Sequence, residues 1–290
     1  MSNPGFESPR SIDQAVEILQ KANGDAAVLA GGTDLLVQMK NGLKKPRIIV
    51  DIKRIPEVSE LNLDAAGLRV GAGVASAELN ENAQVKAAYP GLLEAADLIG
   101  SSQIQGRASL GGNLCNGSPA ADSVPAMAAL AARCRIAGPG GFREVPVTEF
   151  TTGPGQTVLA PGEFLVDLLF DARPARASDA YLRFIPRTEM DIAVVGAGVA
   201  LTLDAAGSCT QATVALGAVA PTVIMVPAAA DALVGSSLDD AALGRAAAAA
   251  SDAAVPIDDK RGTVAFRKHV AGVLVKRAAR IAAQRAAERN

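Results

Sequence analysis

The sequence predicts a mixed α/β and α+β protein of two domains, and three observations support this. The chain has 290 residues, more than one average domain, so two units are expected, each large enough to bury a core. Strand-like and helix-like apolar patterns alternate through residues 26–170, whereas residues 181–287 group β-rich segments ahead of helices. A linker-like segment at 171–179 separates the two patterns. We therefore expect domains at 1–176 and 177–290.

The N-terminal domain opens with a short amphipathic helix. Ser11 and Gln14 have the spacing of a capping box, and apolar residues follow at helical intervals. An apolar run at 26–30, a glycine pair, a helix over 35–40 opened by Asp34 and a strand at 47–52 form a strand, glycine turn, helix, strand unit. The remaining expected elements are a strand at 68–73, helices within 76–99, a loop at 101–118, a helix at 120–132, and strands at 133–137, 142–147 and 164–170.

The C-terminal domain is expected to be α+β. Three β-rich segments at 181–186, 192–204 and 209–220 are compatible with a meander, and helices follow near 238–252 and 261–287. Arg277, Arg280, Arg285 and Arg289 make the last helix basic. Such a run is either a solvated face or a docking surface for another subunit.

Composition excludes several classes of function. Hydrophobic residues make up 49% of the chain and charged residues 20%, which is a globular composition rather than a disordered one. The formal net charge is -2, so nucleic acid is not an expected partner. No stretch of about 20 residues is apolar and uncharged, and no signal-peptide pattern opens the sequence, so we expect a cytoplasmic protein without a membrane span.

The cysteines and the histidine do not suggest a metal or catalytic centre. Cys115, Cys134 and Cys209 are too far apart for a zinc or iron–sulfur ligand set, and we expect them to be buried small hydrophobic residues. His269 is the sole histidine and lies in the basic last helix, where a surface position is expected. No metal ligands and no catalytic residues are predicted.

Two glycine loops carry the clearest chemical signal. The first consists of Ala30, Gly31, Gly32, Thr33, Asp34 and Leu35, and the second includes Ser109, Gly111, Gly112 and Asn113, with Asp122 nine residues further on. Glycines let backbone N–H groups approach a phosphate, and the hydroxyl and amide groups add donors. Taken singly, each glycine pair is also compatible with simple chain reversal. Two other glycine patterns, at 70–75 and 195–200, lack the third glycine of a dinucleotide fingerprint and are interpreted as strand or turn glycines.

Taken together, in this order and spacing, the loops resemble the flavin subunit of the xanthine dehydrogenase and carbon monoxide dehydrogenase family. AGGTDLL at 30–36 resembles the family's first FAD loop, and SLGGNLCNGSPAADSVPA at 109–126 resembles its second. Residues 181–187 and 191–195 resemble the motif that opens the C-terminal domain, in which a lysine commonly faces the flavin. Arg183 occupies that lysine position, which keeps the charge but changes the donor geometry.

The resemblance implies a fold and a cofactor. The fold is an FAD-binding domain of the vanillyl-alcohol-oxidase (PCMH) type with two α/β subdomains, followed by a small C-terminal α+β domain with a three-stranded sheet and helices. FAD is expected to be noncovalent because the sole histidine lies outside the FAD domain. The implied contacts are the two loops around the pyrophosphate and ribityl chain, Asp122 near the adenosine end, Arg183 at the flavin, and Ile99 and Leu165 against the ring. For Ile99 and Leu165, ordinary core packing is the alternative.

The resemblance also implies partners. A small subunit would carry [2Fe-2S] clusters and a large subunit the molybdenum cofactor, in a dimer of heterotrimers. This chain would accept electrons from the clusters and pass them through FAD to an external acceptor. Two alternatives remain open: a free-standing FAD-dependent reductase of the same fold type, and a nucleotide-binding protein without a redox role. An iron–sulfur insertion in this chain is disfavoured because Cys134 is the sole cysteine between Asp122 and Gly153.

Overall fold

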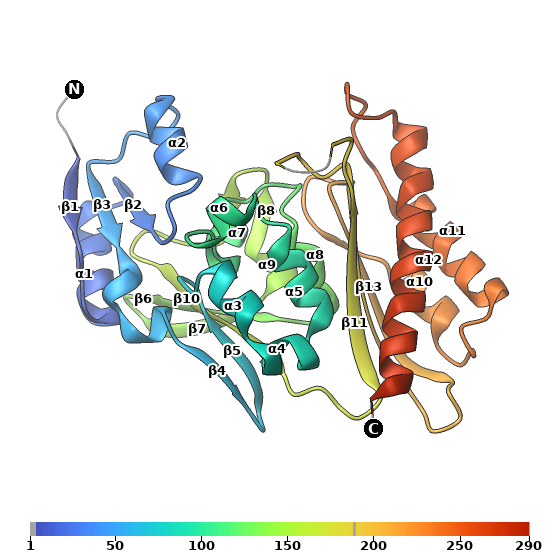
Figure 1. The fold of residues 1–290 in the computed structure, drawn as a ribbon. Coiled ribbons are helices and arrows are strands. Elements are labelled where there is room, and N and C mark those ends of the chain that lie inside the picture. The colour runs from blue at the N-terminus through green and yellow to red at the C-terminus, as the bar shows by residue number, and fades with distance from the viewer. Residues whose placement is uncertain (1–3, 188–189, 290) are drawn as a thin grey trace.

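Three sheets of three or more strands follow one another along the molecule (Figure 1). The computed structural model describes residues 4–187 and 190–289. A three-stranded and a five-stranded sheet form the two subdomains of the N-terminal domain, and a four-stranded sheet backed by helices forms the C-terminal domain. In the described part of the chain, no helix is both long and apolar enough to cross a membrane.

The first subdomain is a small parallel sheet. Its strands are β1 (Gly5–Glu7), β3 (Ile48–Asp51) and β2 (Ala26–Leu29), with helices α1 (Ile12–Ala22) and α2 (Leu35–Lys40). The predicted helix start is confirmed, since the Ser11 hydroxyl accepts a hydrogen bond from the Gln14 N–H at 3.3 Å. Helix α1 packs Ala15, Val16 and Leu19 into the core, whereas α2 has no buried residue.

The second subdomain is a five-stranded antiparallel sheet in the order β4-β5-β10-β6-β7. The strands are β4 (Leu61–Asp64), β5 (Gly67–Gly71), β10 (Phe164–Asp171), β6 (Arg133–Gly138) and β7 (Gly141–Pro146). Its helices are α3 (Ser76–Glu81), α4 (Ala83–Ala88), α5 (Pro90–Asp97), α6 (Ser102–Gln105), α7 (Leu110–Cys115), α8 (Ser123–Ala129) and α9 (Val147–Phe150), and the short strands β8 (Thr151–Gly153) and β9 (Gln156–Thr157) pair with each other. The short 3-10 helices η1 (Ile52–Arg54) and η2 (Pro56–Val58) join the two subdomains.

Strands β4, β8 and β9 and helix α9 of this subdomain were not predicted, and two local predictions were wrong. The expected loop at 101–118 contains α6 and α7, and the expected helix at 120–132 shortens to α8. Helix α7 contains Gly111 and Gly112, which have low helix propensity, so tertiary packing rather than local preference stabilises it. These errors concentrate around the second glycine loop.

The C-terminal domain is an antiparallel meander, as predicted, with one strand more than the expected three. The strands are β11 (Ala177–Phe184), β12 (Val195–Leu203), β13 (Cys209–Gly217) and β14 (Ile224–Met225), followed by helices α10 (Pro227–Leu233), α11 (Asp240–Ala253) and α12 (Val264–Glu288). The predicted linker at 171–179 was wrong at its end, because β11 begins at Ala177 and buries Ser178 and Asp179. The division at 176/177 stays a prediction.

The two faces of this sheet differ. Helices α10 and α12 cover one face, with α11 packed against these two helices, and α5 and α8 of the N-terminal domain cover the other face (Figure 1). Small residues permit the second contact: a Cβ on Gly198 would overlap the carbonyl oxygen of Pro125, and a Cβ on Gly217 would lie 2.5 Å from the Pro125 ring. The glycines at 195–200 are therefore strand residues selected for close packing, which confirms that they form no dinucleotide fingerprint.

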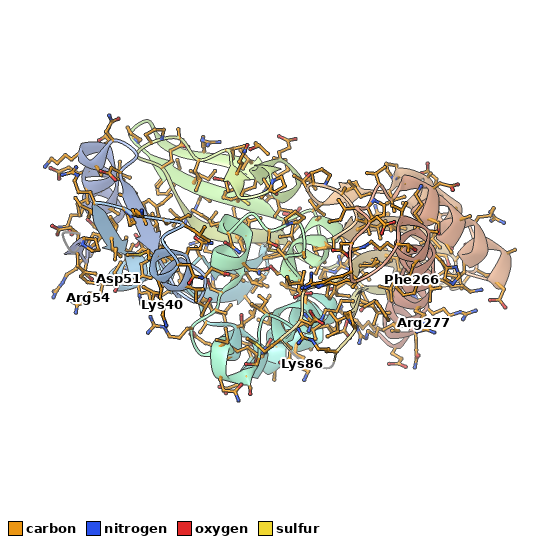
Figure 2. The ribbon with its side chains drawn as sticks, turned by 90° about the horizontal axis from the view of Figure 1, so that it is seen from above. Lys40, Asp51, Arg54, Lys86, Phe266 and Arg277 are labelled. Carbon is orange, nitrogen blue, oxygen red and sulfur yellow. The ribbon has the colours of Figure 1, made fainter. Side chains whose placement is uncertain are left out.

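Arginine side chains at the C-terminal end of α12 and just after it link the two domains. Arg285 pairs with Glu94, and Arg289 donates to the carbonyl oxygens of Ala88 at 3.0 Å and Ala177 at 2.8 Å. Arg280 pairs with Asp240 within the C-terminal domain. Most of the basic run is thus engaged inside this chain. Arg277, labelled in Figure 2, is exposed, and its use in docking stays a prediction.

Candidate cofactor-binding site

A cavity of about 550 Å³ lies between the two subdomains of the N-terminal domain. One wall comes from residues 24–28, 30–35, Gln38, 44–46 and Ile52. The other comes from Ala72, Ile99 and several residues of the segments 108–116 and 155–165 of the second subdomain. In Figure 2, Lys40 marks helix α2 and Asp51 marks the end of β3 beside the first wall. The volume lies in the range of small-molecule and cofactor sites.

The structure brings together most of the predicted site residues. Those that line the cavity are Ala30, Gly31, Gly32, Thr33, Asp34, Leu35, Ile99, Ser109, Gly111, Gly112, Asn113 and Leu165. Asp122 and Arg183 are not among the lining residues; they lie where the two domains meet. The first loop packs directly against the segment that leads into the second, because Gly31 lies so close to the backbone of Arg107 that a Cβ would overlap its carbonyl oxygen.

Two carbonyl oxygens of the first loop accept hydrogen bonds from positively charged side chains. The Lys53 ammonium donates to the Ala30 carbonyl at 3.0 Å, and the Arg107 Nε donates to the Gly31 carbonyl at 3.2 Å. Gly32 has a φ of 80°, a left-handed conformation that favours glycine. Within residues 4–187 and 190–289, no protein atom accepts the N–H groups of Gly31 through Leu35. The loop therefore offers a row of unsatisfied donors at the cavity wall.

The second loop is the N-terminus of helix α7. The Ser109 hydroxyl accepts from the Gly112 N–H at 3.0 Å and donates to the Ala72 carbonyl at 2.7 Å, so it caps the helix and ties it to the residue that follows β5. Gly111 packs against Ala72, where a Cβ would lie 2.6 Å from backbone atoms. Among the described residues, the N–H groups of Leu110 and Gly111 have no protein acceptor. This loop too presents donors to the cavity.

One side-chain hydrogen bond spans the two walls. The Gln38 Nε2 on α2 donates to the Asn116 Oδ1 just after α7, at 2.9 Å. Both residues line the cavity, and they belong to different subdomains. Because α2 has no buried residue, this hydrogen bond helps to hold α2 against the second subdomain.

Asp122 and Arg183 form an ion pair at 2.8 Å that is almost removed from solvent. The other Asp122 oxygen accepts from the Tyr181 hydroxyl at 3.1 Å, and Arg183 also donates to the Leu98 carbonyl at 3.0 Å. Burial raises the pKa of Asp122 to about 6, although Arg183 and the Tyr181 hydroxyl act in the opposite direction. The pair thus links β11 to the start of α8, behind the second loop and next to the lining residue Ile99.

The cavity offers little acid–base chemistry. Its titratable side chains in the described structure are Asp25, Asp34, Lys44, Lys45 and Cys115. Burial raises the pKa of the Cys115 thiol to about 12, so this cysteine is an unreactive neutral group. Cys134 and Cys209 are buried as predicted, whereas Cys115 is only partly buried and lines the cavity. His269 is exposed on α12, as predicted.

Several residues of the site were not predicted from the sequence. Lys44 and Lys45 line the cavity at the end near Gly24 and Asp25, and Thr157 and Leu159 extend its second wall. Lys53 and Arg107 do not line the cavity but donate hydrogen bonds to carbonyl oxygens of the first loop. The two adjacent lysines after α2 are the one signal that could have been noticed, since a basic pair close to a glycine loop suits a phosphate ligand.

The residues present fit FAD. Two rows of unpaired backbone donors, the Thr33 hydroxyl and two lysines suit a diphosphate. Ile99, Leu159, Phe164 and Leu165 give the second wall an apolar portion suited to an aromatic ring system. The cavity therefore combines the polar and apolar surfaces that a flavin dinucleotide requires.

Known proteins share this organisation. A family model described as the FAD binding domain in molybdopterin dehydrogenase matches residues 2–170, and one described as the CO dehydrogenase flavoprotein C-terminal domain matches residues 180–282. The chain is 33% identical over 281 residues to the carbon monoxide dehydrogenase medium chain of Afipia carboxidovorans, with 97% of each chain covered. It is 34% identical over 221 residues to the xanthine dehydrogenase FAD-binding subunit of Escherichia coli O157:H7, covering 76% of this chain and 75% of that one.

A solved structure agrees with the sequence comparisons. Reconstituted CO dehydrogenase from Oligotropha carboxidovorans contains a chain that superimposes with a TM-score of 0.93 at 32% identity, covering 98% of this chain and 99% of that chain. Fold and site together define an FAD-binding flavoprotein with a PCMH-type domain. The chain belongs to the FAD-binding medium subunits of the carbon monoxide dehydrogenase and xanthine dehydrogenase family of molybdenum hydroxylases, and it is an oxidoreductase subunit.

Proposed function

We propose that this chain is the electron-exit subunit of a molybdenum hydroxylase. In this proposal it accepts electrons from [2Fe-2S] clusters of a small subunit and passes them through FAD to an external acceptor. The observation that carries the proposal is the cavity in which two glycine loops from separate subdomains present unpaired N–H groups side by side. Relatives named as medium chains support it, because a medium chain implies small and large partners.

We assign noncovalent FAD to this cavity. The loops at 30–35 and 109–113 would hold the pyrophosphate and ribityl chain, and Ile99 and Leu165 would contact the ring system. When bound, FAD would supply a carrier that takes up electrons one at a time from one-electron clusters and can release them singly or as a pair. The position of Asp122 behind the second loop favours a supporting role for this residue over direct contact with the adenosine.

The chain's own residues hold and orient the cofactor rather than move protons. Cys115 stays a neutral thiol, and the carboxylates and lysines of the described cavity line its first wall rather than the apolar portion of its second. This favours electron transfer over a free-standing reductase, which needs a proton donor beside its substrate. The organic substrate would be selected on the large molybdenum subunit, and we expect a cytoplasmic dimer of heterotrimers.

The test is to purify the chain alone and together with its small and large partner subunits, extract the cofactor by denaturation and identify it by mass. We expect FAD near one per chain in the complex, released without covalent attachment, and reduction of the flavin by organic substrate only when all three subunits are present. Turnover by the isolated chain would favour the free-standing reductase. A bound nucleotide without a flavin spectrum in both preparations would contradict the proposal.

A further inference from the structure

A buried serine stands directly behind the second glycine loop. Ser123 is the first residue of α8 and is 0% exposed, and it is not among the residues that line the cavity. Its hydroxyl donates to the Asn113 Oδ1 at 2.7 Å, and its backbone N–H reaches the same oxygen at 3.3 Å. One amide oxygen thus receives two hydrogen bonds from one residue.

These bonds determine which end of the Asn113 amide faces the ligand. A carboxamide has one oxygen with two lone pairs and one NH2 group with two donors. Both lone pairs are occupied by Ser123, whereas in the described structure the NH2 group has no protein partner. Because Asn113 lines the cavity, the NH2 group is the end of this side chain left for a ligand.

A fixed orientation matters because the two ends of the amide are nearly the same in shape and opposite in hydrogen bonding. The phosphates, hydroxyls and ring carbonyls of FAD accept hydrogen bonds, and an amide oxygen turned toward a phosphate would repel it. The neighbouring serine offers no substitute, since the Ser109 hydroxyl is already engaged with Gly112 and Ala72. Without the Ser123 hydroxyl only the longer N–H bond at 3.3 Å remains, so the amide can rotate more readily and present its oxygen.

We propose that Ser123 is a positioning residue that holds Asn113 as a hydrogen-bond donor toward FAD, an inference that rests on the proposed function. Ser123 is itself held in place from the C-terminal domain. Its neighbour Asp122 pairs with Arg183 on β11, and Pro125 packs against Gly198 on β12. The C-terminal domain therefore contributes to flavin binding through α8 without lining the cavity.

The experiment is a double-mutant cycle on FAD affinity. The complex of the chain with its partner subunits is stripped of FAD and titrated with FAD, followed by flavin fluorescence, for wild type, Ser123→Ala, Asn113→Ala and the double variant. We expect Ser123→Ala to raise the dissociation constant about tenfold, which corresponds to one well-placed hydrogen bond. In the Asn113→Ala background, Ser123→Ala should have no further effect, because its target is gone.

Two further variants separate positioning from packing. Ser178→Ala is the matched control, since Ser178 is equally buried and its hydroxyl has no hydrogen-bond partner among the described residues, so its FAD affinity should equal that of wild type. Asn113→Asp keeps the shape but would turn a carboxylate oxygen toward the phosphates. It should bind FAD more weakly than Asn113→Ala, and this comparison remains informative even if Ser123→Ala folds poorly.

The outcomes are distinct. Additive losses for Ser123→Ala and Asn113→Ala, or an Asn113→Asp variant that binds FAD as well as wild type, would overturn the positioning role while leaving the FAD site intact. Failure of the wild-type complex to take up FAD would instead overturn the proposed function.

Discussion

The two glycine loops face the same cavity but are supported in different ways. The first belongs to a segment without buried helix residues, and side chains of Lys53 and Arg107 hold its carbonyl oxygens from behind. The second is a helix N-terminus, tied through Ser109 to Ala72, just after β5, and through Asn113 to α8. The first loop therefore depends on the N-terminal domain, whereas the support of the second extends through Asp122 to Arg183 in the C-terminal domain.

The glycines of the two loops also differ in what they are needed for. Gly31 and Gly111 each lie against the backbone of a neighbour, Arg107 or Ala72, with no room for a Cβ. Gly112 is different, since a Cβ there would meet only the Ser109 hydroxyl at 3.1 Å. In these loops a glycine is therefore needed either because the protein backbone packs closely against it or because a phosphate must approach it. Mutation of single glycines can separate these two needs.

The largest effect is expected for Gly31→Ala. The added Cβ would overlap the Arg107 carbonyl oxygen, so the first loop would have to move away from the segment that leads into the second. We expect the free energy of unfolding to fall by more than about 3 kcal/mol, at the upper end for overpacking, together with loss of FAD. Urea denaturation of the apoprotein measures this, and an unchanged midpoint would show that Gly31 is not packed against Arg107.

Arg183→Met is expected to have the next largest effect. It leaves the Asp122 carboxylate buried without its counter-charge, which should reduce the free energy of unfolding by about 3 kcal/mol at neutral pH. Arg183 lowers the pKa of Asp122, so its removal raises that pKa further, and the loss should be smaller at pH 5, where Asp122 takes up a proton. Equal losses at pH 5 and pH 8 would refute this account of the pair.

Gly112→Ala should separate ligand binding from stability. Inside helix α7, alanine stabilises the folded state by about 0.5–1 kcal/mol relative to glycine, while its methyl group hinders approach of the pyrophosphate. We expect apoprotein stability equal to or above wild type and FAD affinity about tenfold lower. Gly244→Ala, in the exposed helix α11 with open space around it, is the control and should leave FAD affinity unchanged. If both variants bind FAD normally, the second loop does not approach the phosphates.

The smallest expected effect is a dependence of the free energy of unfolding on pH. Burial raises the pKa of Asp122, and that of Asp179, to about 6, above the value of about 3.9 in an unfolded chain. At a pH between these two pKa values, the folded state therefore binds more protons than the unfolded chain does. The contribution of these groups to stability is present below about pH 4 and is lost as the pH rises through about 6. Asp122→Asn should make the slope shallower; an identical slope for wild type and Asp122→Asn would rule out Asp122 as a source.

Much of the fold could be predicted because its local signals agree with its tertiary structure. The cap at Ser11, the strand and helix around the first loop and the order of the C-terminal strands all follow from periodicity and capping. Helix α7 could not be predicted, because Gly111 and Gly112 oppose a helix locally and packing on Ala72 overrides that preference.

The site was predicted to a similar extent. Residues whose backbone or short side chain faces the cavity, such as Thr33 and Asn113, were found from the two loops. Lys53 and Arg107 were missed because long side chains reach the first loop from other elements, and sequence spacing gives no sign of this. The position of Asp122 depends on a partner 61 residues away, which only the packed domains reveal.

The most direct test of the central claim is amide hydrogen exchange of the complete protein with and without FAD. The account predicts that FAD slows exchange in both segments that carry unpaired N–H groups, Gly31 to Leu35 and Leu110 to Gly111, because the cofactor becomes their acceptor. Tight binding of FAD with no added protection in either segment would contradict the assignment of the cofactor to these loops.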